Sequence, residues 1–434
     1  MGFLINTAYL LALLVLSPWL LYRSLTQGKY RRGLLRKWLG LAMRRNNDLP
    51  CAWFHGVSVG EVYLLRQLIA RFRDRHPTWE CVVSTTTDTG FAEACKHFPD
   101  LHVFYWPLDF TWAVHRALRQ VNPSLIILAE SELWPNFLAA ARKRGVPVAV
   151  VNGRMSPRSL ARYRRLGFLV RSVLDHLDLL AVQTEEYAAG FRALGADPQR
   201  VQVTGSVKYD GVQADRANPK TRELRRQLAV QPDSLVWVAG STQRPEEELV
   251  LGIYRRLKDR YPKLRLFLVP RQKERFEEVA NLLKHSGQAY VRRSQMAEPI
   301  TDSSAVVLVD TMGELGALWG LADVAFVGGS LDGRRGGQNM IEPAAYGAAV
   351  VFGPHVWNFR ETAARLVAAR AAFQVADAVE LETIMERLLA DAAERERLGT
   401  AARQFVFQQQ GATARTIHLL EKLIHDRPAG RDAA

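Results

Sequence analysis

The stretch Ala52-Trp-Phe-His-Gly-Val-Ser-Val-Gly-Glu-Val62 joins two different patterns of side chains. Residues 52–54 form an apolar run that predicts a buried strand, and from residue 62 to residue 72 apolar side chains recur at helical spacing. Between the two patterns the chain turns beside Ser58 and Gly60, and Glu61 follows in the first turn of the helix. A strand that leads directly into a helix predicts one unit of an α/β fold.

The same rhythm repeats along the chain. We predict strands at residues 52–59, 81–86, 102–106, 125–129, 146–151, 179–183 and 201–204. After a polar stretch the rhythm restarts, and we predict strands at 235–239, 264–269, 289–291, 306–309, 324–327, 349–352 and 373–375. Helix-length segments between such apolar runs indicate parallel sheets that are covered on both faces. The predicted fold class is α/β, with two doubly wound, Rossmann-like domains that face a cleft.

The rhythm also predicts how the 434 residues are divided. We expect a membrane anchor and basic interfacial segment at 1–47, an N-terminal domain at 48–207, a hinge at 208–219, a C-terminal domain with terminal helices at 220–426 and a disordered tail at 427–434. In open α/β sheets, ligands bind beyond the carboxyl ends of the strands. We therefore expect the functional site in the cleft between the two domains.

Three cysteines, Cys51, Cys81 and Cys95, are scattered along the chain without a Cys-x-x-Cys pair. This usage is typical of a reducing compartment and disfavours a disulfide framework or a structural zinc site. The sequence also lacks His-Glu-x-x-His, Asp-x-Asp, GxxxxGK[ST] and a GxGxxG after the first predicted strand. Dinucleotide-dependent enzymes and P-loop ATPases are therefore disfavoured. We expect neither a metal nor a cofactor.

The first 47 residues contain eight lysines and arginines and no acidic residue. Residues 3–22 are almost wholly apolar, and a helix of that length spans about 30 Å, the thickness of a bilayer core. The charges follow the apolar run, unlike those of a secretory signal, and the positive-inside rule leaves the rest of the chain in the cytoplasm. Apolar residues recur at helical spacing among the arginines and predict a helix on an anionic membrane surface: Leu34, Leu35, Trp38, Leu39 and Met43.

Two forms of anchor fit the apolar segment. Its length favours a spanning helix, whereas Asn6 and the pair Ser17-Pro18 weaken a span and fit a monotopic helix that dips into the membrane. Both forms place the protein on a membrane. A nucleic-acid partner is disfavoured, because the basic residues cluster beside the apolar run and no nucleic-acid-binding signature occurs.

Carboxylates follow two predicted strands of the first domain. Glu61 lies where a glutamate can either complement the helix dipole or act in catalysis. Glu130 and Glu132 share one strand-end loop, where two carboxylates can raise each other's pKa or orient a hydroxyl. Lys208 closes the domain, where it can bind an anion in the cleft or lie on the surface of the hinge.

Strand ends of the second domain carry polar or glycine-rich turns. The small residues Ser241 and Thr242 allow backbone N–H groups to approach an anion. Arg271 follows the next strand and suits a bidentate grip on a phosphate or carboxylate. Further turns lie at residues 310–315, 328–330 and 334–343. Glu342 can accept hydrogen bonds from both hydroxyls of a ribose, so these turns together indicate a nucleotide site.

Nine motifs occur in order along the chain: HGVSVGE (55–61), ESELWPN (130–136), NGRMSPRS (152–159), TGSVKYD (204–210), GSTQ (240–243), LVPRQKERF (268–276), DTMGEL (310–315), FVGGSL (326–331) and GGQNMIEPAAYG (336–347). Together they resemble the 3-deoxy-D-manno-octulosonic acid (Kdo) transferases of glycosyltransferase family 30, from the N-terminal anchor to about residue 410. The resemblance implies a GT-B fold and a location on the cytoplasmic face of the inner membrane. It further implies inverting, metal-independent transfer of Kdo from CMP-Kdo to the lipid A precursor (lipid IVA) in lipopolysaccharide core biosynthesis.

The resemblance also implies roles for individual residues. Glu61 would be the general base that takes a proton from the acceptor hydroxyl, and Glu130 and Lys208 would stabilise the transition state. The positions that match the CMP-binding residues of the family are Pro270, Arg271, Met312, Gly313, Glu314, Asn339, Met340, Ile341 and Glu342. Further candidates in the same turns are Ser58, Gly60, Glu132, Ser241, Thr242 and Gln338. The implied partners are CMP-Kdo, the lipid A precursor and the anionic phospholipids of the inner membrane.

Three positions depart from the family pattern. Gln243, Gln272 and Gln338 stand where the family usually has histidine, and glutamine cannot carry a positive charge. This change predicts a weaker grip on the leaving group or a slightly different donor. Two alternatives stay open: another GT-B sugar-nucleotide enzyme, such as an epimerase, which needs no lipid anchor, and a non-catalytic lipid A-binding relative, which the catalytic-type residues disfavour.

Overall fold

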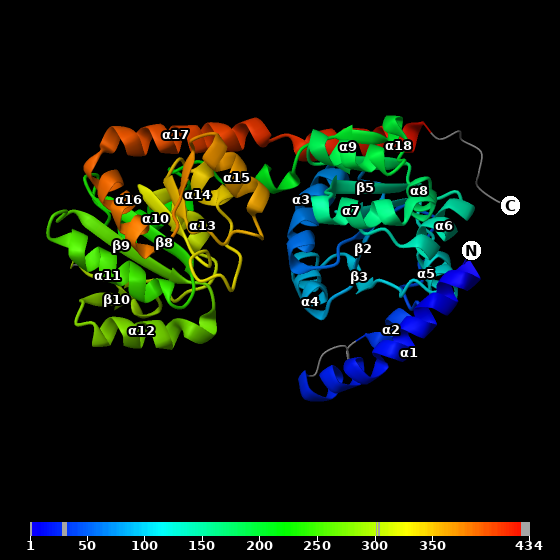
Figure 1. The fold of residues 1–434 in the computed structure, drawn as a ribbon, viewed down its shortest axis with the longest axis horizontal. Helices are drawn as coiled ribbons and strands as arrows, with labels where there is room; N and C mark the ends of the chain where they lie inside the picture. The colour runs from blue at the N-terminus through cyan, green and yellow to red at the C-terminus, as the bar shows by residue number, and fades with distance from the viewer. Residues whose placement is uncertain (1, 28–32, 301, 303, 427–434) are drawn as a thin grey trace. The chain divides into compact units, whose positions relative to one another are not determined.

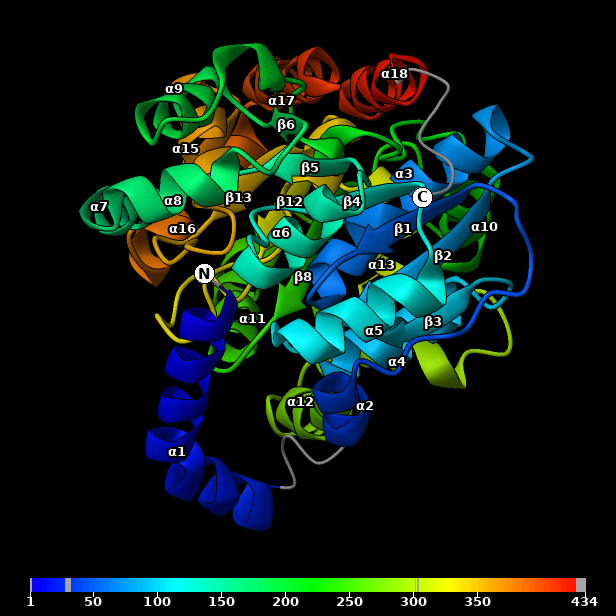
Figure 2. The same cartoon turned by 90° about the vertical axis from the view of Figure 1, so that its right-hand side faces the viewer.

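The structure is a computed structural model that describes residues 2–27, 33–300, 302 and 304–426. The chain forms two compact units (Figure 1 and Figure 2). Unit 1 combines Met1–Asp210 with Gln410–Ala434, and unit 2 is Gly211–Gln409. The boundary after Asp210 falls inside the segment that the sequence predicts as a hinge.

Unit 1 contains a parallel sheet of seven strands in the order β3-β2-β1-β4-β5-β6-β7. The strands are β1 (Cys51–His55), β2 (Glu80–Thr85), β3 (His102–Tyr105), β4 (Leu125–Ala129), β5 (Val148–Gly153), β6 (Leu179–Val182) and β7 (Val201–Val203). Their helices are α3 (Val59–Arg75), α4 (Asp88–His97), α5 (Thr111–Val121), α6 (Pro135–Lys143), α7 (Pro157–Arg165), α8 (Gly167–Leu174) and α9 (Glu185–Ala193). Because β1 pairs with both β2 and β4, the strand order reverses beside β1, which is where open α/β sheets bind ligands.

Unit 2 repeats this plan with the strand order β10-β11-β9-β8-β12-β13-β14. The strands are β8 (Leu235–Thr242), β9 (Leu264–Pro270), β10 (Tyr290–Arg292), β11 (Val306–Leu308), β12 (Val324–Val327), β13 (Ala349–Phe352) and β14 (Ala372–Gln374). The helices are α10 (Pro219–Gln227), α11 (Glu246–Lys258), α12 (Phe276–His285), α13 (Leu315–Leu318), α14 (Ile341–Ala345), α15 (Arg360–Ala368), α16 (Ala378–Ala390) and α17 (Ala392–Gln409). The first strand, β8, pairs with β9 and β12, so the reversal again lies beside the first strand of the unit. Short 3₁₀ helices complete the two units: η1 (Pro198–Arg200), η2 (Val207–Tyr209), η3 (Lys273–Arg275), η4 (Arg293–Gln295) and η5 (Trp319–Leu321).

Each of the strands predicted from the sequence is present. The central strands are buried throughout, and helices cover both faces of each sheet, which is why these strands read as continuous runs of apolar residues. The largest error in a predicted strand boundary concerns the first strand. The strand predicted at 52–59 ends at His55, because Ser58 takes the N-cap position and Val59 already begins α3.

The last helix, α18 (Ala412–His425), corrects the predicted domain boundary at residue 426. Figure 1 shows this red helix on unit 1, whereas the orange α17 lies on unit 2. Ile417 and Leu420 join the apolar cluster beneath α3, and the carboxylate of Asp210 accepts the backbone N–H groups of Gly411 (2.7 Å) and Thr413 (2.5 Å). The helical pattern after residue 378 cannot tell which sheet each helix covers. The tail predicted at 427–434 lies outside the described residues.

Two helices precede the first strand in unit 1, α1 (Gly2–Gln27) and α2 (Leu34–Leu39). The window Gly2–Trp19 of α1 is long and apolar enough to cross a membrane. The helix predicted around residues 34–43 is present but ends at Leu39. The predicted basic segment is described in part, because Lys29, Arg31 and Arg32 lie outside the described residues.

Candidate active site

Glu61 lies in the first turn of α3, which follows β1 at the place where the strand order of unit 1 reverses. The backbone N–H of Val57 donates to Oε2 of Glu61 over 2.6 Å, and Oγ of Ser58 donates to Oε1 over 3.2 Å. Burial raises the pKa of Glu61 to about 7, although the hydrogen bond from Val57 opposes the shift. The negative charges of Glu130 and Glu132 raise this pKa further. This shift brings the pKa of the carboxyl group close to neutral pH, the range that suits a general base.

Two glycines lie beside this carboxylate for different reasons. A Cβ atom on Gly56 would lie 3.0 Å from Cβ of Glu61 and 3.1 Å from Cδ1 of Leu65, so glycine allows α3 to start this close to the strand. A Cβ atom on Gly60 would meet no atom within 4 Å among the described residues. Packing within unit 1 does not require a glycine at position 60, and the open space beside Gly60 leaves room for a ligand at the start of α3.

Glu130 follows β4 with a left-handed backbone (φ 58°), which costs a residue other than glycine about 1–2 kcal/mol. Its buried carboxylate pairs with two cations. Nη2 of Arg154 lies 2.7 Å from Oε2, and Nζ of Lys208 lies 3.7 Å from Oε1. Strained backbones of this kind cluster at functional sites, where the surrounding structure holds them in place. The structure thus brings together the predicted residues Glu130 and Lys208 and adds Arg154.

Arg154 and Asn152 were missed by the sequence predictions, although both lie in the NGRMSPRS motif. Asn152 has a left-handed backbone (φ 54°), and its Oδ1 accepts the backbone N–H of Val207 over 3.0 Å. This bond fixes η2, the short helix that carries Lys208. The available signal was the position of the motif at the end of β5, the same edge of the sheet at which Glu61 and Glu130 lie.

Glu132 makes a local contact within the same loop. Nε1 of Trp134 donates to its Oε2 over 3.1 Å, just before α6 begins. Burial raises the pKa of Glu132, the indole hydrogen bond lowers it, and the charge of Glu130 raises it. Glu132 therefore acts on Glu61 through its charge, while its hydrogen bond within the described residues supports the start of α6.

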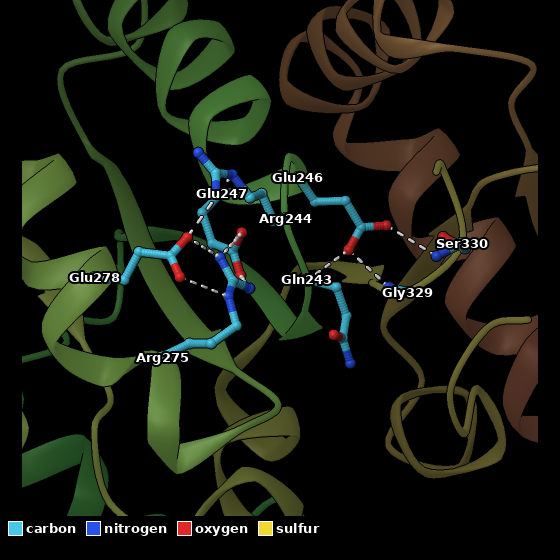
Figure 3. A network of polar contacts seen from close by, with 8 residues as sticks. All are labelled: Gln243, Arg244, Glu246, Glu247, Arg275, Glu278, Gly329 and Ser330. Atoms are coloured by element: carbon cyan, nitrogen blue, oxygen red, sulfur yellow. Dashed lines mark hydrogen bonds and ion pairs between the residues drawn. The ribbon is translucent and has the colours of Figure 1, made fainter. Parts of the chain in front are cut away.

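In unit 2, Glu246 joins two loops at the start of α11 (Figure 3). Its side chain is buried, and Oε2 accepts the backbone N–H groups of Gln243 (2.9 Å) and Gly329 (2.7 Å). The other oxygen, Oε1, accepts the N–H groups of Ser330 (2.8 Å) and Leu331 (3.0 Å). The carboxylate thus connects the turn after β8 with the turn after β12. The sequence predictions missed Glu246, and a run of three glutamates at the helix start was the only local signal.

A second group in Figure 3 braces the segment after β9. Nη1 and Nη2 of Arg275 lie 2.7 and 3.1 Å from the two carboxylate oxygens of Glu247, and Nη2 lies 2.9 Å from Oε1 of Glu278. Arg275 is therefore held within the unit. Arg271, four residues earlier, is exposed and has no ion pair within the described residues, so its guanidinium is available to an anion.

Three of the residues predicted to bind the nucleotide lie close together. Nδ2 of Asn339 donates to Oε1 of Glu342 over 2.9 Å. Burial raises the pKa of Glu342, whereas this hydrogen bond and the positive charge of Arg271 lower it. Arg271 is fixed through its backbone N–H, which donates to the carbonyl of Thr242 over 3.0 Å. The arrangement offers one carboxylate and one guanidinium at the same edge of the sheet.

The predicted residues Met312, Gly313 and Glu314 form the turn between β11 and α13. Met312 is 63% exposed, and Gly313 has a left-handed backbone (φ 88°) that favours glycine. The carboxylate of Glu314 accepts a hydrogen bond from Oγ1 of Thr311 and pairs with Nη2 of Arg293 over 2.9 Å. Glu314 therefore stabilises the turn through contacts inside unit 2, whereas the side chain of Met312 is exposed.

The remaining candidates are mostly buried. Ser241 has a left-handed backbone (φ 57°) at an irregularity near the end of β8, next to the buried Thr242. Met340 and Ile341 are 0% and 1% exposed, so neither residue presents a surface to a ligand in this structure. The other two lie at loop edges, Pro270 at the end of β9 and Gln338 beside Gly329. Among the residues that the structure describes, no group of three histidine, cysteine or acidic side chains is arranged to hold a metal ion.

Comparisons with known proteins decide the family. Residues 29–211 match the family model of the 3-deoxy-D-manno-octulosonic-acid transferases (kdotransferases). The 3-deoxy-D-manno-octulosonic acid transferase of Haemophilus influenzae is 35% identical over 371 residues, which cover 85% of this chain and 86% of that protein. This chain belongs to the Kdo transferase family. The Kdo transferase of Chlamydophila psittaci is 31% identical over 425 residues, covering 97% and 96% of the two chains. The predicted activity class is thereby confirmed, and the chain is a glycosyltransferase.

Solved structures support the fold of this Kdo transferase. The crystal structure of UDP-GlcNAc 2-epimerase from Neisseria meningitidis bound to UDP-GlcNAc matches 86% of this chain and 100% of that chain, with a TM-score of 0.59 and 13% identity. At this identity the likeness concerns the fold alone. Together with the two parallel sheets, it confirms the α/β, GT-B-like fold predicted from the sequence.

Proposed function

We propose that this Kdo transferase moves Kdo from CMP-Kdo to the lipid A precursor, lipid IVA, with inversion and without a metal. The observation that carries the proposal is the state of Glu61. Its carboxyl group has a pKa raised to about 7, and the space beside Gly60 is open. A carboxylate with these properties suits the removal of a proton from a sugar hydroxyl at neutral pH.

In the proposed reaction, the acceptor hydroxyl oxygen forms a bond to the anomeric carbon of Kdo. The bond from that carbon to the phosphate oxygen of CMP breaks, and the electron pair leaves with the phosphate. The proton of the hydroxyl passes to Glu61. Direct attack from the side opposite the leaving group inverts the anomeric carbon, so no covalent intermediate with the enzyme is needed.

The charges around Glu130 support a role in the transition state. Kdo carries a carboxylate, and its ring becomes positively charged as CMP departs. The carboxylate of Glu130 can stabilise the positive ring, and the cations Lys208 and Arg154 can bind the sugar carboxylate. All three side chains are held in place before substrate arrives, so little reorganisation is needed when charge develops.

The leaving group needs a compensating charge for its phosphate. Arg271 is exposed, lacks an ion pair within the described residues and suits bidentate binding of a phosphate. Backbone N–H groups at the end of β8, at Ser241 and Thr242, can add hydrogen bonds, and Glu342 can accept bonds from ribose hydroxyls. The guanidinium of Arg271 and the backbone N–H groups stabilise the negative charge of the departing phosphate, a task for which other transferases use a metal ion. Gln243, Gln272 and Gln338 add no positive charge.

We place the enzyme on the cytoplasmic face of the inner membrane. The apolar window in α1 and the eight basic residues among the first 47 support this location. The lipid A precursor is an amphiphile, so an acceptor held in the membrane and an enzyme bound to the same surface meet without leaving the bilayer. Anionic phospholipids are therefore proposed partners, together with CMP-Kdo and the lipid A precursor.

A transfer assay tests the proposal. Purified full-length protein is incubated with CMP-Kdo and tetra-acylated lipid A precursor in detergent, with and without EDTA, and the products are identified by mass spectrometry. We expect the acceptor mass to rise by whole Kdo units, equally with EDTA, and CMP to appear in step. Release of CMP without transfer of Kdo to lipid IVA would show that the enzyme uses a different acceptor. Absence of both would favour the non-catalytic lipid A-binding alternative, whereas loss with EDTA would overturn metal independence.

A further inference from the structure

The N-terminal end of α1 is bonded to the folded domain of unit 1. Nδ2 of Asn6 donates to Oγ1 of Thr111 over 2.8 Å, and Oδ1 of Asn6 accepts the backbone N–H of Thr111 over 3.2 Å. The same Oδ1 accepts Nδ2 of Asn136 over 3.2 Å. Thr111 begins α5 and Asn136 lies in the first turn of α6, so one side chain of α1 binds the starts of two helices.

Tyr9 extends this contact by one helical turn. Its hydroxyl donates to Oδ2 of Asp109 over 3.1 Å. Asp109 is buried and also accepts the backbone N–H groups of Asn136 (3.0 Å) and Phe137 (2.8 Å), so it caps α6. The polar contact with α1 therefore reaches a carboxylate that belongs to the core of the domain.

The chain after α1 returns to the same domain. Gly33 packs so closely on Tyr105 that a Cβ atom would lie 2.4 Å from its ring, and Nζ of Lys37 lies 4.6 Å from the centre of that ring. Nε1 of Trp112 donates to the carbonyl of Trp38 over 3.0 Å. Gln27 and Gly33 are six residues apart, a separation that an extended chain cannot stretch beyond about 21 Å. Both ends of α1 are therefore tied to one domain.

A helix that crosses a bilayer has its two ends on opposite sides of about 30 Å of hydrocarbon. Here Asn6 binds the starts of α5 and α6, and Tyr9 binds Asp109 just before α5. The chain that leaves α1 contacts Tyr105 in β3 and Trp112 in α5, which belong to the same domain. Both views in Figure 1 and Figure 2 show α1 starting beside α5 and α2 lying next to α5. We propose that α1 does not span the membrane but lies in one leaflet, with both of its ends on the side of the folded domain.

The two faces of α1 fit this arrangement. Gly2, Asn6, Tyr9 and Leu13 recur at spacings of four, three and four residues and form the half-buried face. The opposite face exposes large apolar side chains: Phe3 (81%), Leu4 (71%), Leu11 (59%), Leu14 (71%) and Val15 (76%). The exposed apolar face suits contact with lipid hydrocarbon, whereas the half-buried face, which carries Asn6 and Tyr9, contacts the folded domain.

The charges near α1 identify an anionic lipid surface as the partner. The guanidinium of Arg23 lies 4.7 Å from the centre of the Trp19 ring, and such aromatic and basic side chains are typical of the level of lipid headgroups. The first 47 residues contain no acidic side chain that would repel anionic lipids. The inference rests on the proposed membrane location but not on the proposed reaction.

The sidedness of the N-terminus tests the inference. Full-length protein receives a short Gly-Ser extension with one cysteine before Met1, in a Cys95→Ser background, and is compared with the unmodified chain, whose exposed Cys95 reports the side of unit 1. A membrane-impermeant maleimide is applied to intact spheroplasts and to inside-out vesicles. We expect the N-terminal cysteine to react like Cys95, in the inside-out vesicles only. Reaction in intact spheroplasts, with Cys95 protected, would overturn the inference.

Flotation with vesicles tests the lipid-facing side of α1. Vesicles of phosphatidylethanolamine and phosphatidylglycerol are mixed with detergent-free protein and separated on a density gradient. We expect the double variant Leu14→Glu with Val15→Glu to lose bound protein at least about tenfold, whereas Leu49→Glu, at an exposed leucine outside α1, keeps it. If the double variant floated with the vesicles as well as the wild type, the exposed face of α1 would not be the lipid-binding face. Kdo transfer to a detergent-solubilised acceptor is measured for all variants, so failure of the proposed reaction is recorded separately.

Discussion

Glu61 and Glu246 occupy matching places in two sheets of the same plan, and their surroundings give them different tasks. Each lies in the first turn of the helix after the first strand of its unit, beside the point where the strand order reverses. Glu61 accepts one backbone N–H and one hydroxyl, and open space lies beside the preceding residue, Gly60. Glu246 accepts four backbone N–H groups from two loops.

The number of donors decides which protonation state each site can accommodate. Burial raises the pKa of both carboxyl groups, and in Glu246 four backbone hydrogen bonds offset only part of this shift. Every oxygen of Glu246 faces N–H donors, so a proton on this group would displace a hydrogen bond, and the site fits an anion. Glu61 has fewer donors and two acidic neighbours, so it exchanges a proton near pH 7. The same residue type thus serves as a fixed anion in unit 2 and as a proton acceptor in unit 1.

The largest expected effect follows from replacing the proton acceptor. Glu61→Gln removes the basic oxygen but keeps the shape and the acceptor for the N–H of Val57. We expect the rate of Kdo transfer to fall by roughly 10²–10⁴-fold, with the free energy of unfolding almost unchanged. Single-turnover transfer and urea unfolding measure the two quantities. Loss of stability in step with activity would mean that Glu61, like Glu246, is mainly structural.

The converse result is expected for the fixed anion. Glu246→Gln places an amide NH₂ against backbone N–H donors, which leaves buried donors without an acceptor. We expect a loss of roughly 3 kcal/mol in the free energy of unfolding of unit 2, measured by denaturant unfolding and followed by the fluorescence of the buried Trp237 and Trp319. Glu248→Gln, at an exposed position in the same helical turn, is the control and should stay within about 0.5 kcal/mol of the wild type. An unchanged stability for Glu246→Gln would contradict the assigned role.

A smaller effect is expected for the cations that pair with Glu130. Arg154→Ala removes the ion pair of 2.7 Å and leaves Lys208, at 3.7 Å, as the remaining cation paired with Glu130 among the described residues. A charged hydrogen bond contributes about 1.5–3 kcal/mol, so we expect transfer to fall by roughly tenfold to a hundredfold. Arg158→Ala, four residues later on the exposed start of α7, should retain the wild-type rate. Equal rates for both variants would show that Arg154 is only a surface partner of Glu130.

The smallest expected effect is a shift in pH dependence. A base with a pKa of about 7 gives a transfer rate that rises with pH below that value and levels off above it. The charge of Glu132 raises the pKa of Glu61, so Glu132→Gln should move the acid limb of the profile to lower pH by less than about one unit. Gln at this position keeps an acceptor for Nε1 of Trp134. If the acid limb of the pH profile did not move, the charge of Glu132 would have no effect on the pKa of Glu61.

The comparison also indicates what a sequence can and cannot predict here. Glu61, Glu130 and Lys208 each follow a strand that is recognisable from local composition, so the topology alone sends them to one edge of the sheet. Three of the four N–H partners of Glu246 are 83–85 residues away in the chain, and no local sequence pattern predicts that their N–H groups converge on one carboxylate. Arg154 and Asn152 lie in a recognised motif, but their contacts depend on the left-handed backbones of Glu130 and Asn152, which the sequence does not predict.

The sequence also predicts the elements better than the domain to which each element belongs. The strands were predictable because buried parallel strands are rich in apolar, β-branched residues. The sheet that a C-terminal helix covers is a tertiary property, so α18 was assigned to the wrong domain. Its place depends on Asp210, which caps the helix from two hundred residues earlier in the chain.

The return of α18 to unit 1 has a consequence for biosynthesis on the ribosome. The apolar side of α3 that Ile417 and Leu420 cover is translated early, but its cover emerges only after the 199 residues from Gly211 to Gln409. At roughly 5–20 residues per second, this delay is about 10–40 s. During that interval the nascent N-terminal lobe carries an uncovered apolar patch, while unit 2, encoded without interruption, can fold first. Premature stop codons just before α18 should therefore yield a chain with a completed second lobe and an aggregation-prone first one.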